Sequence, residues 1–267
     1  MRTINTVLLS LALLCGTGAC AMCGKPAAMG QEATINLENA NVQAMNHVSV
    51  TRGGVHVHLT QGPQLNVKVD NPYGLGITIT ANGNTLDVEG VDGTIKKEQV
   101  AHVYVTLPNI SDLAVMGAGD ITAGNITTEQ MDITVTGSGD IATGKLQVAS
   151  LLKVKVTGSG DADITRAKAN EVQIQVTGSG DVDIDDLNAK LLTAHIAGSG
   201  DMEIENGTVT DAQLQVKGSG DISARLTASG TVDVTQHGSG DITLRGNIAH
   251  LNKTSSGSGR VTYSPTR

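Results

Sequence analysis

Gly158-Ser159-Gly160-Asp161 is one copy of a four-residue phrase that sets the period of the chain. The phrase begins the series as Gly117-Ala118-Gly119-Asp120 and closes it as Gly257-Ser258-Gly259-Arg260, where the acid is lost. The copies between them end at Asp140, Asp161, Asp181, Asp201, Asp221 and Asp241, and successive steps are 20, 21, 20, 20, 20, 20 and 19 residues. A constant turn phrase at a fixed period predicts a repeat architecture.

The residues around each phrase alternate between apolar and polar. Val154 and Val156 precede one copy, and Ala162 and Ile164 follow it on the same parity as its two glycines. The apolar side chains therefore face inward, while Ser and Asp face outward at a bend. At that bend an inward side chain would clash with the neighbouring layer, so glycine is required. The predicted corner glycines are Gly117, Gly119, Gly137, Gly139, Gly158, Gly160, Gly178, Gly180, Gly198, Gly200, Gly218, Gly220, Gly238 and Gly240.

This pattern predicts an all-β fold, a parallel β-helix (solenoid) with coils of about 20 residues. Each coil buries its apolar face only against the next coil, and adjacent coils lie about 4.8 Å apart. A leucine-rich repeat would need a different consensus, and calcium-binding nonapeptides have the wrong period. The glycines also lack the G-x-G-x-x-G spacing of a dinucleotide loop. We expect the regular repeats to span 111–262 within a domain covering 34–267.

Residues 34–110 are expected to form irregular N-terminal strands of the same domain. Short runs with period-2 alternation occur at 55–59, 65–69, 77–79, 86–88 and 103–107. Turn signals such as Gly53-Gly54, Asn71-Pro72 and Asn82-Gly83 separate them. Such runs are typical of half-buried strands.

The first 21 residues have the plan of a secretory signal peptide. A basic start is followed by an apolar run and then by small residues. Cleavage after Ala21 competes with a lipoprotein-type site, in which Cys20 becomes the lipidated first residue; Thr17 departs from the usual Leu of that site. Residues 22–33 are predicted to form a linker. All three cysteines lie in or beside this segment, so we expect no disulfide in the domain.

The charge and the aromatic content of the chain argue against some classes of partner and substrate. The formal net charge is −8, which disfavours nucleic acid, because binding to phosphates rests on Lys and Arg. Membrane contact is expected only through the lipid anchor. The chain has no Trp and no Phe, although sugar-processing clefts normally use aromatic platforms. This argues against a polysaccharide-active enzyme, which remains the third alternative.

The outward acids form the strongest polar feature of the repeats. Carboxylates at this density suit Ca²⁺, so a weak divalent-cation surface is one reading, and a solvated column that caps turns is the other. Arg225 and Arg245 continue one of the acidic columns, so we expect part of its charge to be paired across coils. The candidate metal ligands are Asp161, Asp163, Asp181, Asp183, Asp185, Asp201 and Glu203.

His56 and His58 share one face of a predicted strand, because they lie two residues apart. Two such imidazoles can chelate a metal ion. The third ligand, His47 or His102, cannot be chosen from spacing. The alternative is a plain polar outer face of the strand.

The chain resembles the head GIN domain family, a group of auto-transporter adhesin-like proteins. The resemblance is carried by 55–62, by 65–69, by 102–108 and by Gly117-Ala118-Gly119-Asp120, in the family's order, and it covers about 45–262. It implies a right-handed β-helix in exported, often lipid-anchored bacterial proteins. It implies no catalytic residues, and the chain lacks the long passenger and barrel of a true auto-transporter.

We therefore expect a non-catalytic, exported β-helix that acts as an adhesin or as a cell-envelope binding module. The second alternative is a structural envelope protein with a cation-binding Asp column. The expected location is the periplasm, the outer membrane or the cell surface. The expected partner is an envelope or surface ligand, no cofactor is expected apart from the Ca²⁺ alternative, and end-to-end association would give an oligomer.

Overall fold

The computed structural model of the protein describes residues 34–36, 44–93, 96 and 99–266. This part forms β-strands and contains no helix, so no segment in it meets the length and hydropathy of a membrane-spanning helix. The predicted signal peptide, Cys20 and the linker lie outside the described residues. The strands are β1 (Thr34–Asn36), β2 (His47–Gln61), β3 (Asn66–Asp70), β4 (Thr78–Asn82), β5 (Thr85–Glu89), β6 (Ala101–Leu107), β7 (Asp112–Ala123), β8 (Ile126–Gly137), β9 (Ile141–Gly158), β10 (Ala162–Lys168), β11 (Glu171–Gly178), β12 (Val182–Gly198), β13 (Met202–Gly218), β14 (Ile222–Gly238), β15 (Ile242–Gly257) and β16 (Val261–Pro265).

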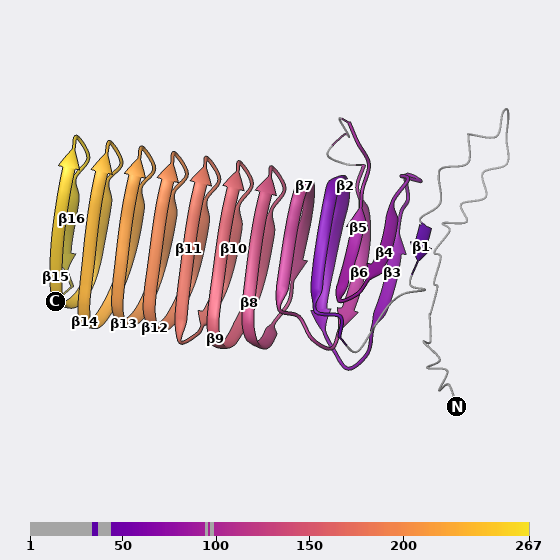
Figure 1. The fold of residues 1–267 in the computed structure, drawn as a ribbon, viewed down its shortest axis with the longest axis horizontal. Helices are drawn as coiled ribbons and strands as arrows, with labels where there is room; N and C mark the ends of the chain where they lie inside the picture. The colour runs from indigo at the N-terminus through magenta and orange to yellow at the C-terminus, as the bar shows by residue number, and fades with distance from the viewer. Residues whose placement is uncertain (1–33, 37–43, 94–95, 97–98, 267) are drawn as a thin grey trace, which may run out of the picture.

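From β7 onward the chain winds as a solenoid of parallel strands. Figure 1 shows the coils standing side by side, from β7 to β16 at the C-terminal end. The register pairs residues one period apart, as Ile184 with Ile204 and Leu192 with Ala212. The corner phrase separates one long strand from the next. The predicted all-β solenoid with coils of about 20 residues is confirmed.

Before β7 the pairing is mixed. β3 runs antiparallel to β6, and β4 runs antiparallel to β5. β2 joins this region to the coils, because it pairs in parallel with β5, β6 and β7. The change to uniformly parallel pairing thus falls between β6 and β7, and β2 provides the edge on which the first regular coil stacks.

The core consists of aliphatic side chains stacked in columns along the solenoid. Val176, Ile196 and Val216 form one such column in register, and each is fully buried. Because coils are about 4.8 Å apart, every layer covers the apolar face of its neighbour. Leu, Ile, Val and Met replace the aromatic residues that the sequence lacks.

The corner glycines are required by the stacking of backbone on backbone. A Cβ atom at Gly180 would lie 2.0 Å from the carbonyl oxygen of Gly160, which is far inside contact distance. At the first glycine of the phrase, two separate reasons require glycine. A Cβ on Gly178 would lie 2.3 Å from the Gly158 oxygen, and its φ of +132° is one that residues with a side chain rarely adopt.

Candidate functional site

The corner aspartates join consecutive coils through their side chains. In each case Oδ1 accepts the backbone N–H of the residue one coil later, at 2.7–3.0 Å. The donors and acceptors, in order, are Asp140 to Asp120, Asp161 to Asp140, Asp181 to Asp161, Asp201 to Asp181, Asp221 to Asp201, Asp241 to Asp221, and Arg260 to Asp241. One carboxylate oxygen of each corner Asp is thereby committed to the fold, and Oδ2 is the oxygen left for other partners.

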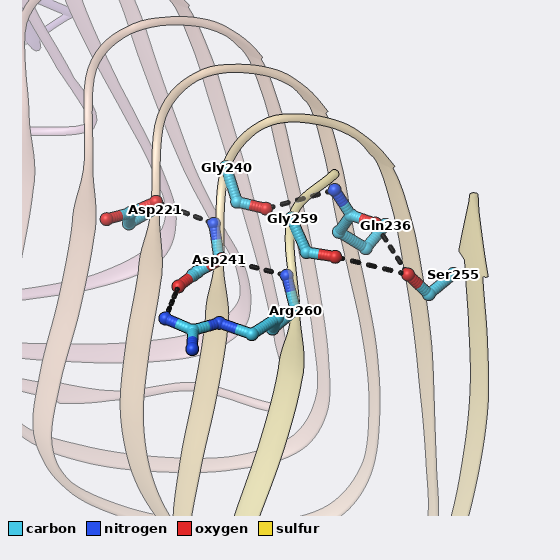
Figure 2. Close-up of polar contacts among 7 residues, drawn as sticks. All are labelled: Asp221, Gln236, Gly240, Asp241, Ser255, Gly259 and Arg260. Carbon is cyan, nitrogen blue, oxygen red and sulfur yellow. Dashed lines mark hydrogen bonds and ion pairs between the residues drawn. The ribbon is translucent and has the colours of Figure 1, made fainter. Parts of the chain in front are cut away.

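Figure 2 shows the last of these hydrogen bonds, in the coils where the series of aspartates ends at Arg260. Arg260 takes the place of the next acid, donates its backbone N–H to Asp241 and places its guanidinium 3.3 Å from Asp241 Oδ2. These contacts, chiefly the backbone hydrogen bond, lower the pKa of Asp241. Nearby, the fully buried Gln236 donates to the Gly240 carbonyl and accepts from Ser255 Oγ.

A second acidic column lies two residues after the corner. Asp163, Asp183 and Glu203 are in register on β10, β12 and β13. Partial burial, followed by repulsion from Asp163 and Glu203, raises the pKa of Asp183 to about 6. The structure therefore brings six of the seven predicted metal ligands into two adjacent columns. Asp185 follows Asp183 by two residues on the same side of β12, so it extends this acidic surface.

Charge pairing across coils involves arginines other than Arg225 and Arg245, the two that were expected. Arg166 pairs with Asp186 at 2.8 Å, and β10 and β12 align these two residues. Arg225 and Arg245 line a cleft of about 240 Å³ together with Glu203 and Glu205. Within the described residues, neither arginine comes within 4.0 Å of a carboxylate oxygen. β13 and β14 lose their regular register between Ile204 and Gly207, the segment in which Glu205 would otherwise pair with Arg225.

Three histidines gather at the N-terminal end of the same face. β2 and β6 place His56 opposite His102, and β7 places Asp120 beside His56. His58 Nε2 lies 3.0 Å from His102 Nδ1, and the rings of His56 and His58 stack with centroids 4.3 Å apart. His56 and His58 continue the two acidic columns, since they pair in register with Asp120 and Thr122 of β7.

Burial lowers the pKa of both His56 and His58, so their neutral forms are favoured at neutral pH. At His56 the nearby Asp120 opposes this effect, and His102 adds to it. At His58 both neighbouring imidazoles reinforce it. His102 is the third member that spacing alone could not choose. His47, the other candidate, lies on β2 with His56 and His58, but its Nδ1 lies 3.4 Å from the carboxylate of Asp112.

A shallow groove runs across the coils, lined by residues about midway in sequence between successive corner phrases. Its floor is formed by small apolar residues that are nearly buried, among them Val148, Ala169, Ala189 and Val209. Its rims carry polar side chains, most of them exposed, and its volume is about 560 Å³. The rim residues are Thr127, Thr128, Gln147, Lys168, Asn170, Asn188, Lys190, Thr208, Thr210 and Ser229. Sequence reasoning missed this groove, although the small residues at inward positions, such as Ala169 and Ala189, were its signal.

Comparison with known families gives one match that covers most of the chain. The family model described as "Putative auto-transporter adhesin, head GIN domain" matches residues 46–208 and 205–265. No curated protein matches the chain.

Crystal structures from Bacteroides and Parabacteroides species share the fold. A "putative adhesin" from Bacteroides fragilis is 19% identical, with a TM-score of 0.59 over 82% of this chain and 92% of that one. A "putative lipid binding protein" from Parabacteroides distasonis is 17% identical, with a TM-score of 0.63 over 87% and 99%. A "putative adhesin" from Parabacteroides merdae is 14% identical, with a TM-score of 0.59 over 87% and 99%. At these identities the likeness shows the fold alone.

Proposed function

The chain belongs to the auto-transporter adhesin-like family with a head GIN domain, and we propose that it is a non-catalytic, exported binding module of the cell envelope. The family and the similar structures are described as adhesins or as a lipid-binding protein, not as enzymes. The polar rims and apolar floor of the shallow groove carry the proposal. We assign the groove an extended polar ligand, such as an envelope polysaccharide or a peptide segment.

The groove suits a long ligand better than a compact one. It spans residues from β8 to β14, so a ligand lying along the solenoid axis meets a new coil about every 4.8 Å. Amide and hydroxyl groups such as those of Asn188 and Thr208 both donate and accept hydrogen bonds. Each contact with such groups is modest, and affinity comes from repeating it over several coils.

Binding of the purified protein to a panel of envelope materials tests this proposal. The panel contains purified capsular polysaccharide, lipopolysaccharide, peptidoglycan and phospholipid vesicles; the vesicles are included because one similar structure is described as lipid-binding. Lys190→Glu and Thr208→Arg change two exposed rim positions, and Lys217→Glu is the matched control at an exposed position of β13 outside the groove. We expect the rim variants to lose binding by about tenfold or more and the control to keep it.

Two results would overturn the proposal. The first is binding to a panel member that the rim variants leave unchanged, which would place the ligand elsewhere. The second is turnover of a polysaccharide by the purified protein, which would make it an enzyme.

A second candidate function is structural and rests on the acidic columns. Partial burial is the main cause of the raised pKa of Asp183, and repulsion from the neighbouring carboxylates adds to it; a divalent cation such as Ca²⁺ would relieve that repulsion. If so, excess Ca²⁺ raises the melting temperature relative to EDTA, and the double variant Asp163→Asn, Asp183→Asn abolishes the difference. Equal melting temperatures of the unaltered protein in Ca²⁺ and EDTA would refute a cation-stabilised structure.

A further inference from the structure

His56, His58 and His102 offer three imidazole nitrogens to one point on the surface. One nitrogen from each ring lies within 4.8 Å of the other two. All three rings are half-buried and face away from the aliphatic core. Two neighbouring strands bring together residues 44 positions apart in the sequence, so the cluster exists only in the folded chain.

We propose that this cluster is a binding site for one divalent transition-metal ion of the Zn²⁺ class. Imidazole nitrogen is a preferred ligand of Zn²⁺, Cu²⁺ and Ni²⁺, whereas Ca²⁺ and Mg²⁺ prefer oxygen. Three protein nitrogens leave the fourth tetrahedral position for water or for a ligand group. The site is therefore distinct in chemistry from the acidic columns, and it shares no residue with the shallow groove.

The strands hold the cluster close to coordination geometry. With Zn–N bonds of about 2.0–2.1 Å, tetrahedral ligand atoms lie about 3.3 Å apart. The nitrogens of His58 and His102 are already 3.0 Å apart. A metal ion lies in the plane of each imidazole that binds it, so His56 and His58 must rotate out of their stacked arrangement, whose rings are inclined by 19°. Outward-facing side chains make such rotations without moving the core.

The surroundings favour a cation. Asp120 lies opposite His56 in the register of β2 and β7, and its carboxylate places negative charge next to the ring. His56 Nε2 also contacts Thr122 Oγ1 at 2.7 Å, which holds the ring on the side of β7. His58 also stacks on Tyr104, with ring centroids 4.8 Å apart, so the rotation that metal binding requires has to release this contact as well.

Calorimetric titration of Zn²⁺ into the purified protein, carrying no histidine tag, tests the site. We expect one Zn²⁺ per chain and a loss of affinity of about 100-fold or more in His58→Asn and in His102→Asn. His47→Asn is the matched control on the same strand, because His47 contacts Asp112 outside the cluster. X-ray absorption at the zinc edge should show three imidazole nitrogens at about 2.0–2.1 Å.

Further measurements separate loss of a ligand from loss of the fold. The melting temperatures of the metal-free variants should match that of the unaltered protein. Excess Ca²⁺ should leave the Zn²⁺ titration unchanged. The proposal fails if the unaltered protein binds no Zn²⁺, if His47→Asn weakens binding as strongly as His58→Asn, or if Ca²⁺ displaces the ion.

Discussion

Asp161 Oδ1 accepts the backbone N–H of Asp181 at 2.8 Å, so a side chain supplies the acceptor for an amide in the next coil. The same bond recurs at every corner from Asp120 to Arg260. Elsewhere in the coil, strand amides bond to the carbonyl groups of the neighbouring strand, as Val182 does to Asp201. The primary role of the Asp in the repeated phrase is therefore structural, because it connects consecutive coils.

Removing one of these acceptors should destabilise the solenoid. Asp161→Ala leaves the Asp181 amide without its partner, and we expect a loss of about 1 kcal/mol, as for the loss of a helix cap or a buried hydrogen bond. Asp161→Asn keeps an oxygen at the same place and should lose much less. Urea denaturation of the three proteins measures the difference. Equal losses in both variants would mean that the charge, and not the acceptor, is what matters.

Replacing a corner glycine should be far more damaging. In Gly180→Ala the added Cβ would lie 2.0 Å from the Gly160 oxygen, and both atoms belong to stacked backbone that cannot move independently. We expect a loss of about 4 kcal/mol or failure to fold. Gly124→Ala is the control, because the nearest atom to its Cβ would be the Leu59 oxygen at 3.7 Å. Its thermal melt should stay within a few degrees of that of the unaltered protein. A Gly180→Ala protein that melts like the control would show that the coils can separate at the corner.

Asp183 should make stability depend on pH. Its folded pKa is about 6 and its ordinary value is 3.8, so the folded protein holds a proton that the unfolded chain has released between these values. By linkage, this group favours folding most at acidic pH, and its contribution declines as pH rises from about 4 through 6. Asp183→Asn should remove that decline. Urea midpoints at pH 5 and pH 7.5 measure it, and the same pH dependence in both proteins would contradict the assignment.

Gln236 should stabilise the C-terminal coils even though it is polar and fully buried. Its amide donates to Gly240 and Gly238 at 3.0 and 3.1 Å and accepts from Ser255 at 2.7 Å. Gln236→Ala loses these bonds and leaves a cavity, for a cost of about 2 kcal/mol. Gln236→Val places an aliphatic residue above Val216, as in the earlier coils, and should cost about half as much. Chemical denaturation ranks the variants, and a valine variant more stable than the unaltered protein would show that the hydrogen bonds contribute nothing.

The repeated phrase and the parity of its neighbours were sufficient to predict the solenoid, its period and its corners. A repeat with one parity of apolar residues and two glycines at a fixed place has few physical solutions, because each layer repeats the constraints of the one below. The parity of Val154, Val156 and Ile164 correctly indicated their burial. Export and the choice of cleavage at Cys20 or Ala21 stay predictions from the same sequence.

The tertiary structure alone decided which polar side chains meet. Residues 44 apart, such as His58 and His102, become neighbours only through the pairing of β2 with β6, and no periodicity in the irregular N-terminal strands indicates that register. Regular counting likewise pairs Arg225 with Glu205, but β13 and β14 lose register between Ile204 and Gly207, and no ion pair forms there among the residues that the structure describes. Stacking of identical layers can be read from a repeated phrase, whereas contacts between unlike strands depend on how the chain folds back on itself.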